Sequence, residues 1–180
     1  MIKIILFSLM MLGMLITFSH FSYSADKTPT KIVVRVVSKD AKVIGSGVGG
    51  ALVRIKNLET GEILAQGKQE GGTGDTDGIM IGPRKRGATV YGTSDAASFQ
   101  AEISLSKPTR IEIDAEAPLG YSQAIQRGSK TVTLIPGQHI LGEGVLIELD
   151  GLIVNLLEPA SGKDLKRGKE ILVEAEVRML

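Results

Sequence analysis

The chain has 180 residues, of which 43% are hydrophobic and 23% charged, with 22 glycines and no cysteine or tryptophan. This length fits one domain with a short appendage, and the apolar fraction is too high for a disordered chain. The 21 basic and 20 acidic residues nearly balance, which argues against a nucleic-acid-binding domain because such domains carry a basic excess. The lack of cysteine excludes disulfides, thiolate metal sites and cysteine nucleophiles in this chain.

Residues 1–24 are predicted to be a secretory signal peptide. One lysine precedes an apolar run at 4–18, and the segment after that run is mostly small and polar, which is the order of a signal sequence. Cleavage after Ser24 is preferred to cleavage after Ala25, which would put the bulky Tyr23 at a small-residue position. An uncleaved anchor is the alternative, but its apolar run is shorter than the roughly 20 residues of a membrane span. We therefore expect a periplasmic or secreted protein with no membrane span once the signal is removed.

The rest of the chain is predicted to form short strands, because period-two patterns recur and helical periodicity is nearly absent. Strands are expected at 32–37, 51–56, 62–65, 79–81, 88–91, 99–105, 110–115, 131–135, 145–149, 152–157 and 171–177. From these eleven segments we expect roughly nine or ten short strands separated by turn signals, which is typical of an all-β, antiparallel, immunoglobulin-like sandwich.

Turn residues predict how several strands connect. The Asn57–Gly61 segment favours a hairpin between 51–56 and 62–65, and residues 70–78, with four glycines, are predicted to be a loop. Asp150-Gly151 predicts a second hairpin, between 145–149 and 152–157, because a type I′ turn needs positive φ at both central residues.

The second predicted hairpin belongs to the most apolar stretch of the exported chain, residues 135–157. We expect Leu146, Leu152, Val154 and Leu156 to line the core, with a docking surface as the alternative. The terminal strand 171–177 is expected to pair within the domain, and addition to a partner's sheet edge is its alternative.

Residues 50–67, with the Thr60-Gly61 turn and the following Asp75-Thr76-Asp77-Gly78, resemble the opening hairpin of carboxypeptidase regulatory-like domains, the prealbumin-type or transthyretin-like sandwiches. Those domains share a small residue, alternating valines, a Thr-Gly turn, a second strand and a Thr-Asp-x-x-Gly loop. The loop is shorter here, and Ile79 or Met80 replaces the aromatic residue that commonly follows it.

The resemblance covers residues 31–117, since 105–113 is similar to a strand entry near the end of such domains. It implies a prealbumin-like, usually non-catalytic sandwich over 25–117 that serves as a spacer, adhesion or assembly module, and it transfers no functional residue. Residues 118–180 are predicted to add strands that complete the same domain or form a small β subdomain.

Three constellations could carry chemistry. A hydrolase would need His139, the one histidine outside the signal, with Glu143 or Asp150 as its acid. No Gly-x-Ser-x-Gly elbow is present, however, and Pro136-Gly137 favours a turn with an exposed imidazole.

Asp75 and Asp77 in the 71–78 loop are the second constellation. They could hold calcium, although a full Asp-x-Asp-x-Asp-Gly loop is missing.

The basic run Arg84, Lys85 and Arg86 is the third constellation. It could bind an acidic partner, a phosphate or a lipid head group, or it could be a solvated loop tip. Only Tyr91, Phe99 and Tyr121 remain as aromatics after the signal, which argues against a stacking platform for glycans.

We expect an exported, non-catalytic β-sandwich without a cofactor, with a structural or protein-interaction role in the bacterial cell envelope and another envelope or secreted protein as its partner. The alternative function is a calcium- or small-ligand-binding domain that uses the 71–78 loop.

Overall fold

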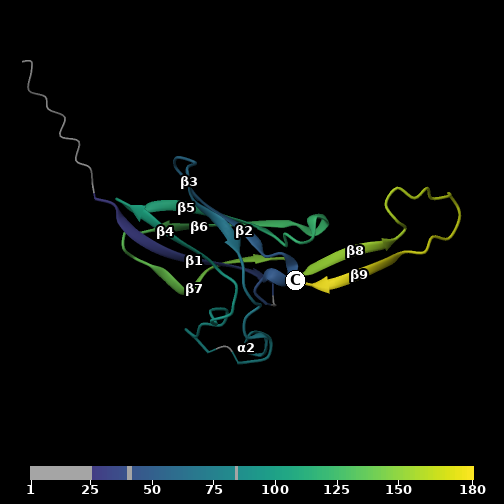
Figure 1. The fold of residues 1–180 in the computed structure, drawn as a ribbon, viewed down its shortest axis with the longest axis horizontal. Helices are drawn as coiled ribbons and strands as arrows, with labels where there is room; N and C mark the ends of the chain where they lie inside the picture. The colour runs from purple at the N-terminus through teal and green to yellow at the C-terminus, as the bar shows by residue number, and fades with distance from the viewer. Residues whose placement is uncertain (1–25, 40–41, 84) are drawn as a thin grey trace, which may run out of the picture.

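The computed structural model of the chain describes residues 26–39, 42–83 and 85–180 (Figure 1). The predicted signal peptide lies outside the described residues. The described residues form nine strands and three short helical segments. They are β1 (Thr28–Ser38), η1 (Ser46–Val48), β2 (Ala51–Asn57), β3 (Ile63–Gln69), α2 (Thr76–Met80), β4 (Phe99–Leu105), β5 (Thr109–Ala117), η2 (Ser122–Ala124), β6 (Gln126–Leu134), β7 (Ile140–Leu149), β8 (Leu152–Glu158) and β9 (Glu174–Met179).

Seven of the strands form two sheets that pack face to face. One sheet has the order β4-β1-β7 and the other the order β3-β2-β5-β6. Alternate residues of both sheets meet in one core, to which β1 gives Val34 and Val36, β2 gives Val53, and β5 gives Ile111 and Ile113. The prediction of an all-β sandwich is confirmed. One pair departs from the antiparallel expectation, because β1 and β7 run parallel.

Strand β1 is buried on both faces. Val34 and Val36 point into the main core, whereas Val37 belongs to a second apolar cluster with Ile79 and Tyr91. That second cluster is supplied by the long, mostly irregular segment between β3 and β4, which carries α2 (Figure 1). The continuous β-branched run of β1 therefore reflects a strand that is covered from two sides.

The predicted strand at 79–81 is wrong. Residues Thr76–Met80 form the short helix α2, whose first turn is capped by Asp75, since the Asp75 carboxylate accepts a hydrogen bond from the Gly78 amide at 3.2 Å. The prediction of a loop over 70–78 is also wrong at its end, where α2 begins. A capping residue at the right place outweighed the poor helix propensity of glycine.

The predicted strand at 88–91 is not a strand either. The amides of Val90 and Tyr91 donate to the carboxylate of Glu143 at 3.1–3.2 Å. The Glu143 side chain thus accepts the hydrogen bonds that a neighbouring strand would accept if this segment were part of a sheet.

The predicted hairpin across Asp150-Gly151 is absent as well. Strand β7 pairs with β1 and strand β8 pairs with β9, so Asp150 and Gly151 connect two different sheets. The side chain of Gln126 holds this connection, because it accepts from the Asp150 amide at 2.8 Å and donates to the Asp150 carbonyl at 3.2 Å. Parallel pairing with β1 buries Val145, Ile147 and Leu149 in the main core, which a β7–β8 hairpin would not require.

The expected core positions of β8 are corrected too. Leu152, Val154 and Leu156 are exposed, and Leu146 is half-buried against the second cluster. The terminal strand pairs within the chain as expected, with β8 as its partner. No helix among the described residues is long and apolar enough to cross a membrane.

Candidate functional site

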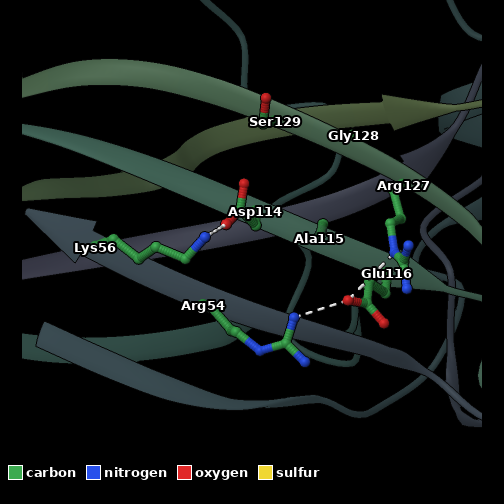
Figure 2. A pocket seen from close by; sticks show the side chains of 8 residues that line it. All are labelled: Arg54, Lys56, Asp114, Ala115, Glu116, Arg127, Gly128 and Ser129. Atoms are coloured by element: carbon green, nitrogen blue, oxygen red, sulfur yellow. Dashed lines mark hydrogen bonds and ion pairs between the residues drawn. The ribbon is translucent and has the colours of Figure 1, made fainter. Parts of the chain in front are cut away.

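Two surfaces of the described chain gather side chains of one kind, and the first is the outer face of the four-stranded sheet. Strand alternation turns Arg54 and Lys56 of β2 outward, together with Asp114 and Glu116 of β5. With Arg127 of β6 they line a hollow of about 360 Å³ (Figure 2). We call this surface the charged face.

The charges of the charged face are paired with one another. Arg54 Nη1 lies 2.7 Å from Glu116 Oε1, Arg127 Nε lies 3.4 Å from the same oxygen, and Lys56 pairs with Asp114 (Figure 2). The hydrogen bond from Arg54, aided by the charge of Arg127, lowers the pKa of Glu116 from its ordinary value. The hydrogen bond to Asp114 raises the pKa of Lys56.

Two of these three pairs, Arg54–Glu116 and Lys56–Asp114, run diagonally between β2 and β5. In the register of the sheet, Arg54 is opposite Asp114 and Glu116 is opposite Arg127, yet Arg54 reaches to Glu116. Such cross-strand pairs stabilise neighbouring strands. Because both carboxylates already have cationic partners, the arrangement fits a solvated sheet face better than a binding site.

The predicted calcium residues lie at the start of α2. Asp75 uses its carboxylate to cap the helix, and Asp77 is exposed in the first turn. Among the residues that the structure describes, no three acidic or histidine side chains come together as a metal site would require. The structure therefore gives Asp75 a local structural contact, and the calcium hypothesis stays a prediction.

The predicted basic run is only partly placed. Arg84 lies outside the described residues, while Lys85 and Arg86 are exposed. The Lys85 carbonyl accepts from the Ala88 amide at 3.1 Å, which closes a turn. This geometry agrees with a loop tip and assigns the run no ligand.

The catalytic candidates are engaged with backbone groups. His139 Nδ1 accepts from the Lys31 amide at 3.0 Å, and the Glu143 carboxylate accepts from Val90 and Tyr91. Arg35, which is buried, donates from Nη1 to the carbonyls of Gly142 (2.5 Å) and Glu143 (2.8 Å). These contacts hold the beginning of β7 and the neighbouring loops together.

The second surface is one face of the β8–β9 hairpin. Three cross-strand pairs of apolar residues lie on it, because the register places Leu152 opposite Met179, Val154 opposite Val177 and Leu156 opposite Ala175. We call these six residues the hairpin face. Leu152, Val154, Leu156, Val177 and Met179 each expose between 55% and 59% of their surface.

Figure 1 shows why this face is uncovered. Strands β8 and β9 project to one side of the sandwich, with the 159–173 loop at their far end. At the base, Arg178 Nη1 donates to the Tyr121 hydroxyl at 3.1 Å, while Ile153 and Leu180 are buried. The hairpin is therefore anchored at its base while its apolar face points to solvent.

From the sequence, Leu152, Val154 and Leu156 are predicted to lie in the core, with a docking surface only as the alternative, although a further signal is present in the partner strand. Residues 171–179 are apolar at every odd position, and three of the four even positions are charged. That alternation predicts a strand with one apolar side. It does not say that the strand stands apart from the sandwich, which depends on β7 pairing with β1.

Comparisons of the chain with protein-family models, with curated proteins and with solved structures find no match. The resemblance of residues 31–117 to carboxypeptidase regulatory-like domains therefore stays a prediction.

Proposed function

We propose that this protein is an exported, non-catalytic interaction module of the bacterial cell envelope that binds a protein through the hairpin face. One observation carries the proposal: a continuous apolar face, more than half exposed at five of its six positions, lies on a hairpin that projects from the sandwich. Apolar patches of this kind on a soluble domain mark contact sites, because leaving them in water is unfavourable.

The rest of the surface supports this function over a catalytic one. The charged face pairs its acids with its bases, and His139 and Glu143 are bound to backbone amides. The signal-like composition of residues 1–24 supports export. The alternative of calcium or small-ligand binding at the 71–78 loop has less support, since Asp75 already caps α2.

Cross-linking in the living cell tests the proposal. A photo-reactive amino acid replaces Val154, on the hairpin face, or Asn155, its neighbour on the opposite side of the same strand. We expect illumination to give a discrete protein adduct from position 154 and little or none from position 155, and the adduct is identified by mass spectrometry. No adduct from either position, or equal adducts from both, would overturn the proposed function.

A further inference from the structure

We infer that the occupant of the hairpin face is a second copy of this chain, packed face to face about a two-fold axis. The inference rests on the proposed function and names its partner. Three steps lead to it: the area that the face offers, the match between its rows of side chains, and the rigid attachment of the hairpin.

The area of the face is sufficient for a homodimer. An aliphatic side chain of this size and exposure presents roughly 100 Å² of apolar surface. The five large residues of the hairpin face give roughly 500 Å² per copy on that basis. Two copies would bury roughly 1,000 Å², which is the smallest area expected of a specific interface and is enough where the two surfaces are complementary.

The hairpin face of one copy is complementary in shape to the hairpin face of a second copy. Val154 and Val177 form the middle row, with Leu152 and Met179 on one side of it. The remaining row contains the small Ala175. We place the two-fold axis between the two faces, along the middle row and perpendicular to the strands. This axis lays the Leu152–Met179 row of one copy over the Leu156–Ala175 row of the other. Met179 of one copy then lies over the small Ala175 of the other, and Leu152 lies over Leu156, so that the two apolar faces can pack closely.

The hairpin is fixed before it binds. A two-stranded sheet alone in water is marginally stable, but the base of this one is held by the Arg178–Tyr121 hydrogen bond and by the Gln126 contacts to Asp150. Leu180 closes the base, where its amide donates to the Gly151 carbonyl at 2.9 Å. The base of the hairpin is therefore already ordered before association, and the second copy supplies the layer that would cover its apolar face.

Disulfide trapping tests this partner directly, because the chain has no cysteine of its own. Val154→Cys puts a single thiol beside the two-fold axis, and Asn155→Cys puts one on the opposite side of β8. We expect mild oxidation of the purified full chain to link two copies of Val154→Cys at least ten times more than two copies of Asn155→Cys. Equal linkage of the two variants would overturn the inference.

Mass measurement by light scattering gives the second arm. We expect the unmodified chain and Asn155→Lys to have the mass of a dimer, and Val154→Lys to have that of a monomer with an unchanged circular dichroism spectrum. An unmodified chain that is monomeric up to about 100 µM, a concentration that detects even weak dimers, would contradict the inference.

The two proposals fail in different ways. A discrete adduct at position 154 whose second component is another protein, together with a monomeric purified chain, would leave the proposed function standing and overturn the second copy. The absence of any adduct in the cell would overturn the proposed function, whatever the mass in solution.

Discussion

Strands β5 and β9 have the same kind of sequence and opposite surroundings. In β5, Ile111 and Ile113 alternate with polar residues and are fully buried between the sheets. In β9, Val177 and Met179 alternate with charged residues and lie mostly in water. Alternation therefore determines that a strand has an apolar side, whereas the pairing of distant segments decides whether that side is covered.

Shortening one apolar side chain on each of these two strands should give the largest difference in stability. Ile113→Ala should destabilise the fold by about 3 kcal/mol, because it leaves a cavity in the core. Val177→Ala should cost under about 0.5 kcal/mol in the monomer, since the removed atoms are mostly in solvent. Urea unfolding followed by circular dichroism, at concentrations where the chain is monomeric, measures both. A Val177→Ala cost as large as that of Ile113→Ala would mean that the hairpin face is buried within one chain.

The next largest effect on stability is expected from a buried polar contact inside the sandwich. The side chain of Gln69 accepts from the Val36 amide at 2.8 Å and donates to the carbonyls of Val36 and Ile44, each at 2.9 Å. Val36 lies beyond Val34, which is the last residue of β1 that pairs with β4. The Gln69 side chain therefore gives Val36 the hydrogen bonds that β4 does not supply there.

Gln69→Leu should therefore destabilise the sandwich by about 2 kcal/mol, because it leaves the buried Val36 amide and Ile44 carbonyl without a partner. Gln66→Leu, at an exposed position of the same strand, is the matched control and should change stability by less than about 0.5 kcal/mol. Denaturant unfolding of both variants gives the comparison. An equal loss of stability in the two variants would mean that the hydrogen bonds of Gln69 do not stabilise the sandwich.

Several elements were predictable from the sequence because their signal is local. The runs of β1, β2, β4 and β5 have strong alternation or β-branched residues, and each is a strand close to its predicted bounds. Other features depend on partners far along the chain. Glu143 binds the backbone of Val90 and Tyr91, over fifty residues away, and so replaces a predicted strand by a tethered loop.

The candidate site was less predictable than the fold. Leu152, Val154 and Leu156 have the composition of a core strand, and only the parallel pairing of β7 with β1 separates them from the sandwich. Parallel pairing depends on contacts distant in sequence, and no short turn announces it. The sequence therefore indicated a strand with an apolar side and misjudged what covers it.

The charged face gives the smallest expected effect and a dependence on pH. Arg54 holds the pKa of Glu116 below its ordinary value, so the folded state binds this proton only at lower pH than the unfolded state does. The ion pair thus contributes stability above the ordinary pKa of a glutamate, and this stability is lost as the pH falls through the lowered pKa of the folded state. Because the pair is at the surface, its contribution should be under about 1 kcal/mol.

Glu116→Gln should therefore lower stability slightly at pH 7, and its stability should approach that of the unmodified chain as the pH falls below the lowered pKa of Glu116 in the folded state. Glu102→Gln, at an exposed position of β4, controls for the loss of one carboxylate elsewhere and should not reproduce this convergence. Urea unfolding at several pH values and low salt measures the effect, since salt would screen the pair. Parallel curves for Glu116→Gln and the unmodified chain would show that the Arg54–Glu116 contact does not stabilise the fold in solution.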